Sequence, residues 1–310
     1  MRDAWARDIT ERARAHWTPE RLAQLARGKM LLLPPVEAAP LLRAMSLLAR
    51  DGSMPPDRVR KYLQINHMVA VLGPSLRELR ATRPTVRLID AACGRSYLSL
   101  LLAWCFRELW KHPVEVLGID RNEALVERCR HDAALALLDD VVRHEASPLA
   151  AIDARAAWAR AFGTSEAIDG VLALHACDTA TDDAILLAVS LDAPLCAVAP
   201  CCHAELARGW SELAGVEAGA FSVVHGAPHL RREAAATTTD AMRTLLLRAE
   251  GYEVWPLEFV PSEHTPKNTL IRAMRRGAGD PGARAAYDAL VAATGGRGLA
   301  LADRLAAIRS

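Results

Sequence analysis

Two aspartates, with a turn of small residues after the first, are the part of the sequence best suited to chemistry. Asp90 and Asp120 each end a short apolar run, and Ala92, Gly94 and Ser96 occupy alternate positions after Asp90. Small side chains allow a backbone turn to approach a ligand closely. Ligands of parallel α/β sheets bind beyond the carboxyl ends of the central strands. The pattern therefore predicts a nucleoside site in which Asp120 accepts hydrogen bonds from both ribose hydroxyls.

The composition and charge of this turn distinguish between two classes of nucleoside cofactor. A dinucleotide needs glycines that admit its pyrophosphate to a helix N-terminus. Only one of the three small positions is glycine here, and a carboxylate at Asp90 would repel a pyrophosphate. The same carboxylate suits the cationic amino-acid end of S-adenosylmethionine, which is the cofactor that we expect. Arg121 is then expected to border the adenine. For Asp90 taken alone, a helix N-cap is the alternative interpretation.

The elements that position these residues follow from the hydrophobic pattern. Short apolar runs alternate with helical periodicity, which is typical of a parallel sheet covered by helices on both faces. The last two predicted strands have no helix between them, so we expect them to form an antiparallel hairpin. We predict strands at residues 86–90, 114–120, 141–146, 169–175, 193–199, 252–260 and 269–274, and helices at 97–109, 123–138, 181–191 and 239–250.

Three parts are expected along the chain. Residues 84–276 would form the sheet domain. Residues 1–83 would form a helical region that serves as a lid or binds substrate, and residues 277–310 a helical tail. The first boundary is placed where helical patterns rich in Ala, Leu and Arg give way to the first apolar run.

Several short segments resemble a known family. Residues 90–99, DAACGRSYLS, and 118–120, GID, resemble motif I and the acidic motif that follows it in class I S-adenosylmethionine-dependent methyltransferases. Residues 174–182, LHACDTATD, and 199–203, APCCH, are similar to blocks in the methyltransferase-domain group that contains methyltransferase-like protein 25. Related blocks occur in the tRNA 2′-O-methyltransferases of the acceptor stem. The resemblance covers residues 60 to 275 and implies a Rossmann-like, seven-stranded α/β fold with a helical N-terminal extension.

The resemblance also implies roles for individual residues. Ala92 and Ser96 replace the usual glycines of motif I, and Asp178 stands where the tRNA enzymes have glycine. The implied cofactor-binding residues are Asp90, Ala92, Cys93, Gly94, Ser96, Asp120, Arg121, Glu145 and His175. The implied catalytic residues are His175, Asp178 and Lys267, and the residues implied on the substrate side are Cys201, Cys202, His203 and Asn268.

Methyl transfer is an in-line displacement for which the protein supplies alignment and, where needed, a base. The Asn/Asp-Pro-Pro-Tyr/Phe motif of many amine methyltransferases is absent after the fourth predicted strand. His175 or Asp178 is therefore expected to remove a proton from a hydroxyl or a ring nitrogen. A histidine bonded inside the sheet and a helix N-cap are the structural alternatives for these two residues, and a surface turn is the alternative for Lys267 and Asn268. The cysteine and histidine spacing matches no closed zinc motif, so no metal is expected.

Composition and charge suggest partners. The chain has 310 residues, of which 51% are hydrophobic, but its apolar runs stop short of the roughly 20 residues of a membrane span. Seven cysteines, two of them adjacent, fit a reducing cytoplasm better than a disulfide framework. Lys and Arg outnumber Asp and Glu by 16 to 8 in residues 1–87 and by 8 to 3 in residues 265–310. These basic flanks favour RNA, either tRNA or rRNA, as the methyl acceptor. A protein or small-molecule acceptor, and a catalytically silent cofactor-binding protein that docks a partner, stay open.

Overall fold

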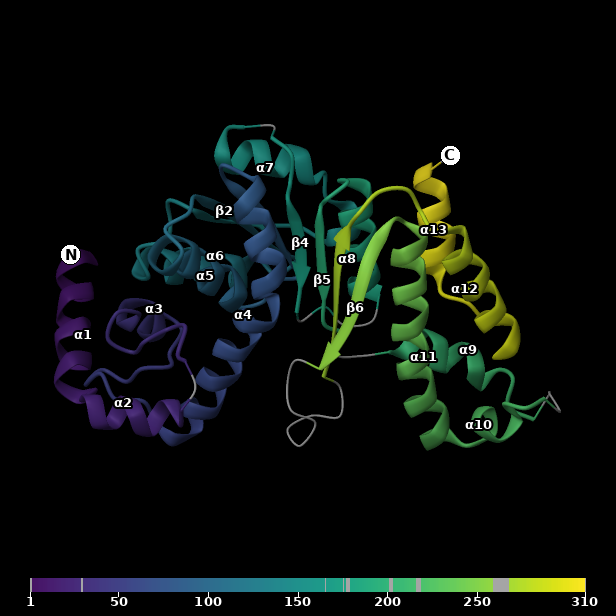
Figure 1. Cartoon of the computed structure of the whole chain (residues 1–310), viewed down its shortest axis with the longest axis horizontal. Helices are drawn as coiled ribbons and strands as arrows, with labels where there is room; N and C mark the ends of the chain where they lie inside the picture. Colours follow the sequence, from purple (N-terminus) through teal and green to yellow (C-terminus); the bar gives the residue numbers. More distant parts are fainter. Residues whose placement is uncertain are drawn as a thin grey trace. The chain divides into compact units, whose positions relative to one another are not determined.

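A computed structural model describes residues 2–28, 30–164, 166–174, 176, 179–200, 203–215, 219–258 and 268–309 (Figure 1). The chain divides into two compact units, residues 1–166 and 167–310. This division falls inside the predicted sheet domain, and the predicted boundaries at 83/84 and 276/277 stay predictions. Within the described ranges, no helix is both long enough and apolar enough to cross a membrane.

The first unit begins with four helices and continues with alternating strands and helices. Its elements are α1 (Arg2–His16), α2 (Pro19–Ala26), α3 (Ala39–Ala44), α4 (Pro56–Thr82), β1 (Val86–Ala91), α5 (Tyr97–Trp104), the π-helical turn η1 (Cys105–Leu109), β2 (Val114–Asp120), α6 (Glu123–Leu135), β3 (Val142–Ala146), the 3₁₀ turn η2 (Leu149–Ala151) and α7 (Ala154–Phe162). The predicted helix at 97–109 is thus an α-helix that ends in a π-helical turn.

The second unit contains the remaining strands. Its elements are β4 (Gly170–Ala173), α8 (Thr179–Ser190), β5 (Leu195–Val198), α9 (Ala204–Ser211), α10 (Ser222–Gly226), α11 (Pro228–Ala249), β6 (Tyr252–Glu258), β7 (Thr269–Arg275), α12 (Pro281–Ala293) and α13 (Ala300–Arg309). Figure 1 shows the β6–β7 pair beside the long helix α11.

Seven strands form one mixed sheet in the order β3-β2-β1-β4-β5-β7-β6. The pairs β1–β2, β2–β3 and β4–β5 are parallel, and β7 is antiparallel to both β5 and β6. Most side chains of β1 and β2, and all of those of β4 and β5, are buried, as expected for parallel strands covered on both faces. The predicted seven-stranded α/β architecture, with its antiparallel closing pair and its helical N-terminal region, is confirmed.

Helix α11 is longer than the sequence predicts. We expected it to begin at residue 239, but it begins at Pro228, and the Arg231-Arg232 pair lies inside it. Proline suits the first turn of a helix because its missing N–H has no partner there in any case. Of the eleven residues before Thr239, only Ala235 is buried in the structure. A helix that buries so little in its first three turns shows weak hydrophobic periodicity, which explains the wrong boundary.

Buried hydrogen bonds order the N-terminal helices around the segment between α2 and α3. The Tyr62 hydroxyl donates to the Leu33 carbonyl at 2.7 Å, and the Leu33 N–H donates to Asn66 Oδ1 at 3.1 Å. The Trp17 indole donates to the Gly52 carbonyl at 2.9 Å. Helix α4 therefore holds the preceding irregular segment through satisfied polar groups.

Gly251, between α11 and β6, is a position where only glycine fits. Its φ is +87°, and a Cβ there would lie 2.1 Å from the Gly277 carbonyl oxygen. We predict that Gly251→Ala lowers the free energy of unfolding by more than about 3 kcal/mol, because left-handed strain adds to a backbone clash. Gly296→Ala is the matched control, since Gly296 has φ +76° and no atom within 4 Å of the added carbon. It should cost about 1 kcal/mol. Urea unfolding checks both variants, and equal losses would contradict the steric argument.

Candidate functional site

The turn between β1 and α5 has an unusual backbone. Ala92, Gly94 and Ser96 have φ values of 54°, 55° and 56°, which places alternate residues in the left-handed region. Two of these residues are not glycine, so the turn stores some strain, on the order of 1 kcal/mol for each of them. The Cys93 N–H donates to the Ile119 carbonyl at 2.9 Å, and the Ser96 N–H donates to the Cys93 carbonyl at 2.8 Å. Backbone bonds thus fix the turn against the end of β2.

Asp120 joins this turn to the loop after β2. The Gly94 N–H donates to Asp120 Oδ2 at 3.0 Å, and the Asn122 N–H donates to Asp120 Oδ1 at 3.0 Å. A carboxylate has about four lone-pair positions, so each oxygen keeps capacity for another donor. The side chain is half-buried, and Arg121 beside it is exposed. Asp120 therefore has the acceptor capacity that two neighbouring hydroxyls would need.

Asp90 is turned into the protein. Its side chain is buried, and Oδ2 accepts hydrogen bonds from the Ser99 hydroxyl at 2.6 Å and the Ser99 N–H at 3.2 Å. Burial raises the pKa of Asp90 to about 7, and the charge of Asp120 adds to this rise. In the structure, the Asp90 side chain is thus hydrogen-bonded to Ser99 of helix α5. Its contact with the amino-acid end of a cofactor stays a prediction.

A buried pair supports the turn from β3. The Ser96 hydroxyl lies 2.7 Å from His144 Nε2, and burial lowers the pKa of His144 to about 4, so the imidazole is neutral near pH 7. Gly118 makes room for this ring, because a Cβ there would lie 2.8 Å from His144 Cδ2 and 3.1 Å from Cys93 Sγ. Gly118 was recognised only as part of the GID motif, and neither its role in making room for the ring nor the role of His144 was predicted. A glycine inside an otherwise apolar strand was the available signal.

Two thiols lie under the same turn. Cys93 and Cys129 are buried, and their sulfur atoms lie 3.9 Å and 3.2 Å from the Gly94 carbonyl oxygen. A hydrogen bond to the Cys129 sulfur, together with burial, raises the pKa of Cys93, so its thiol stays protonated. Cys93 was predicted to bind the cofactor. In the structure its side chain is buried, and its sulfur contacts the Gly94 carbonyl oxygen.

Glu145, at the end of β3, forms an ion pair. Its Oε1 lies 2.6 Å from Arg160 Nη2 of α7. The pair borders a pocket of about 440 Å³ against β3, which Arg130, Arg143 and His144 also line. The prediction that Glu145 approaches an adenine is untested, and its carboxylate would have to do so while it is paired with Arg160.

Most of the predicted acceptor-side residues cannot be placed. His175, Asp178, Cys201, Cys202 and Lys267 lie outside the described residues. Asn268, immediately before β7, is described. Its Nδ2 donates to Glu258 Oε1 at 2.7 Å, which ties the facing ends of β6 and β7 together. Roles in catalysis for these residues stay predictions.

His203 belongs to a buried polar network of the second unit. Its Nε2 lies 2.8 Å from Asp240 Oδ1, and Arg243 Nη1 lies 3.6 Å from the same oxygen. Arg243 Nε donates to Asp182 Oδ1 at 2.8 Å, with 1% and 3% of these two side chains exposed. The network links α8, α11 and the start of α9. The sequence analysis placed only His203 in a site, because nothing in the pattern of α11 marks Asp240 and Arg243 as buried.

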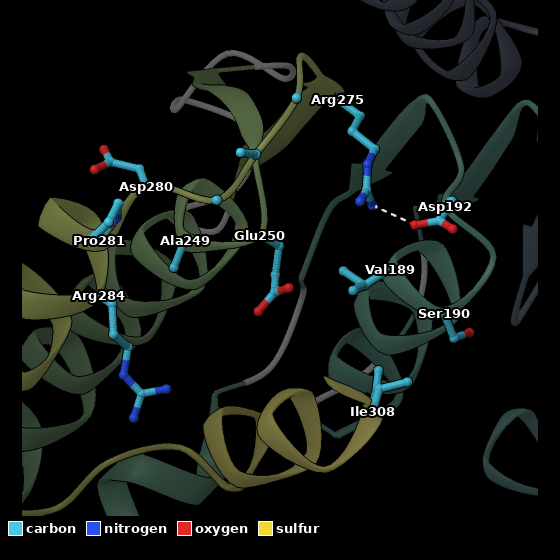
Figure 2. Close-up of a pocket in the computed structure, with 13 residues that line it drawn as sticks. Val189, Ser190, Asp192, Ala249, Glu250, Arg275, Asp280, Pro281, Arg284 and Ile308 are labelled. Atoms are coloured by element: carbon cyan, nitrogen blue, oxygen red, sulfur yellow. Dashed lines mark ion pairs between the residues drawn. The ribbon is translucent and has the colours of Figure 1, made fainter. Parts of the chain in front are cut away.

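Figure 2 shows a different pocket of the second unit, of about 670 Å³. It lies where β7 ends and α12 begins, and none of the predicted site residues lines it. Its Arg275 pairs with Asp192 at 2.9 Å, and its Arg284 pairs with Asp288 at 3.3 Å. These cations are already compensated, so we assign no ligand to this pocket.

No group of three or more metal-ligating side chains suited to a metal ion occurs in the described part of the chain.

Asp90 predicts a measurable pH dependence of stability. The unfolded chain ionises this carboxyl near its ordinary pKa of 3.8, whereas the folded protein keeps the proton up to about pH 7. The free energy of unfolding should therefore fall as the pH rises from about 4 to about 7, by up to about 4 kcal/mol from this group. Asp90→Asn stays neutral and can still accept both bonds from Ser99, so it should lose this component. Urea unfolding at pH 4.5 and pH 8 compares the two proteins, with Asp3→Asn on the exposed side of α1 as control. Parallel pH profiles would refute the assignment.

Residues 60–209 match the family model Methyltransf_32, described as a methyltransferase domain. No curated protein matches the sequence. The chain is similar to an O-methyltransferase from Bacillus cereus in complex with SAH, with 14% identity, coverage of 89% of this chain and 100% of that chain, and a TM-score of 0.40.

Two further solved structures are similar. One is an SAH-bound methyltransferase from Podospora anserina, with 11% identity, coverage of 82% of this chain and 93% of that chain, and a TM-score of 0.40. The other is a putative sarcosine dimethylglycine methyltransferase from Galdieria sulphuraria, with 10% identity and a TM-score of 0.33, where the match covers 45% of this chain and 47% of that chain. Residues 60–209 are thus similar to a methyltransferase domain, and the strand order of the sheet is that of the Rossmann-like class I methyltransferase fold.

Proposed function

We propose that the protein is an S-adenosylmethionine-dependent methyltransferase. The observation that carries this proposal is the arrangement of Asp120, which links the Gly94 turn to the end of β2 and keeps acceptor capacity on both carboxylate oxygens. The match of residues 60–209 to a methyltransferase-domain family supports it. The solved O-methyltransferase from Bacillus cereus is described as a complex with SAH, the product form of the same cofactor.

The residues of the turn fit such a cofactor. Ala92 and Gly94 are half-buried and have no bulky side chain, so a nucleoside can lie against this part of the turn. Asp120 would hold the two ribose hydroxyls. Asp90 is protonated or ionised with nearly equal ease near neutral pH, because burial brings its pKa to about 7. A cationic amino-acid end would shift that balance towards the carboxylate.

When bound, the cofactor supplies a methyl group on a positively charged sulfur. The protein would orient this group and exclude water, and a base would take a proton from the acceptor hydroxyl or ring nitrogen. His175 and Asp178 are our candidates for the base, and Lys267 for contact with an acidic acceptor. Cys201, Cys202, His203 and Asn268 are our candidates for the acceptor side.

RNA is the acceptor that we favour. The basic excess in residues 1–87 and 265–310 supports a polyanionic partner. The low aromatic content, 5%, argues against recognition by base stacking, so contacts to phosphates would dominate. A protein or small-molecule acceptor is the alternative, as is a silent cofactor-binding protein.

The ribose contact is tested by Asp120→Asn. In the variant, the amide NH₂ group faces one of the two backbone N–H groups that now donate to the carboxylate. The ribose hydroxyls also lose a charged acceptor. We expect affinity for S-adenosylhomocysteine to fall by about 10-fold to 100-fold. Glu123→Gln, in the exposed first turn of α6, is the control and should bind as the wild type does. Isothermal titration calorimetry measures both, and unchanged binding by Asp120→Asn would remove Asp120 from the site.

The acceptor is tested by transfer of a labelled methyl group. Purified protein is incubated with tritiated S-adenosylmethionine and with separate RNA, protein and metabolite fractions. We expect label in RNA, and less of it as salt rises from 50 to 200 mM, because phosphate contacts release counterions. Label in protein or metabolites alone would exclude RNA as the acceptor. No label in any fraction, together with tight binding of the cofactor, would favour the silent protein.

A further inference from the structure

A buried histidine lies in the loop that follows β5. His203 comes after the end of β5 at Val198 and directly before α9, which begins at Ala204. Only 3% of its side chain is exposed. Because ligands of α/β sheets bind beyond the carboxyl ends of the strands, a side chain of this loop can line an acceptor site. His203 was predicted to lie on that side of the site.

A carboxylate contacts one nitrogen of the His203 ring. His203 Nε2 lies 2.8 Å from Asp240 Oδ1, and 14% of the Asp240 side chain is exposed. A carboxylate can only accept hydrogen bonds, so Nε2 is the nitrogen that carries a proton and donates it. In a neutral imidazole the other nitrogen, Nδ1, then has a lone pair and can only accept a hydrogen bond.

Helices α11 and α8 restrain this carboxylate. Arg243 Nη1 lies 3.6 Å from Asp240 Oδ1, and Arg243 Nε donates to Asp182 Oδ1 at 2.8 Å. The second contact is buried, with 1% of the Arg243 side chain and 3% of the Asp182 side chain exposed. An orienting partner of this kind fixes the tautomer and the rotation of an imidazole. The chain of contacts therefore restrains the rotation of the His203 ring.

The second nitrogen of the ring has no partner within the described part of the chain. His203 Nδ1 is buried there without a hydrogen bond. A buried polar atom without a partner costs free energy, which a donor group on a ligand would recover. His225, a buried histidine of the same unit, differs because both of its ring nitrogens lack a partner among the described residues, so no hydrogen bond orients its lone pair. His203 combines a free acceptor with a fixed orientation.

We propose that His203 Nδ1 accepts a hydrogen bond from an O–H or N–H group of the methyl acceptor, and that Asp240 is the positioning residue that directs this lone pair. This inference rests on the proposed function and specifies the acceptor-side role of His203. The acceptor must then carry a hydrogen-bond donor near the atom that receives the methyl group. His203 orients the acceptor through this bond, and the base stays a separate residue, for which His175 and Asp178 are our candidates.

Two substitutions of His203 separate the roles of its two nitrogens. The amide of His203→Gln reaches the position of Nε2 and can still bond to Asp240, but it leaves no acceptor at the position of Nδ1. The amide of His203→Asn reaches the position of Nδ1 and loses the bond to Asp240. His229→Gln, at an exposed histidine in the first turn of α11, is the control.

Three measurements are made on each variant. Urea unfolding gives its stability, and calorimetry gives its affinity for S-adenosylhomocysteine. Transfer of tritiated methyl groups into the fraction that accepts the label gives kcat and KM.

The order of stability and the order of activity should be opposite. His203→Gln should be the more stable variant because it keeps the buried contact with Asp240, but its kcat/KM should fall about 10-fold to 100-fold. His203→Asn should be less stable and should keep the higher kcat/KM of the two. All variants should bind S-adenosylhomocysteine as the wild type does. A purely structural role of His203 predicts the same order in both measurements.

The tautomer of His203 is read directly by ¹⁵N NMR of protein labelled in its histidines. The His203 signals are identified by their absence in His203→Gln, and the wild type should carry its ring proton at Nε2. In Asp240→Asn the amide NH₂ group can donate to Nε2, so the proton should move to Nδ1 in part or all of the molecules. This variant should lose kcat/KM as His203→Gln does, while its affinity for S-adenosylhomocysteine stays that of the wild type.

Several results would overturn the inference. A ring proton at Nδ1 in the wild type would show that this nitrogen cannot accept a hydrogen bond. A kcat/KM of His203→Gln equal to that of the wild type would exclude the contact with the acceptor, as would a wild type that binds S-adenosylhomocysteine but labels no fraction. Parallel losses of stability and activity would assign His203 a structural role only. Failure of the wild type to bind S-adenosylhomocysteine would instead refute the proposed function, and the NMR measurement would still decide whether Asp240 fixes the tautomer.

Discussion

The hydrogen bond from the Gly94 N–H to Asp120 is the contact on which the candidate site depends. It joins the turn after β1 to the end of β2, with 3.0 Å between the Gly94 nitrogen and Asp120 Oδ2. The left-handed residues of the turn, the buried thiols below it and the Ser96–His144 pair all act on the position of Gly94. Without this bond, the turn would lose its link to the carboxylate that is suited to a ribose.

The two aspartates that were predicted to bind one cofactor have different environments in the structure. Asp120 is half-buried and keeps acceptor capacity, whereas Asp90 is buried and bonded to Ser99. Burial is the cause of this difference, because it raises the pKa of Asp90 to about 7.

The sequence predicts the sheet well because each strand is a short apolar run bounded by turn residues. The observed bounds of β1 and β2 differ from the predicted ones by one residue at most. Contacts between distant segments leave no such pattern, so the His144 ring beside Gly118 and the buried Arg243–Asp182 ion pair were not predicted. Helix α11 was predicted too short for a related reason, because its first turns bury only Ala235.

The buried arginine of the second unit constrains how this protein can change over evolution. Arg243 contacts Asp182 on α8 and Asp240 on its own helix, and Asp240 in turn contacts His203. Loss of the arginine alone would remove a buried cation from beside Asp182 and Asp240, which is destabilising, whereas joint replacement of a buried ion pair by well-packed apolar residues is often neutral. Substitutions of His203, in the loop after β5, are therefore expected to be accompanied by substitutions on α8 and α11.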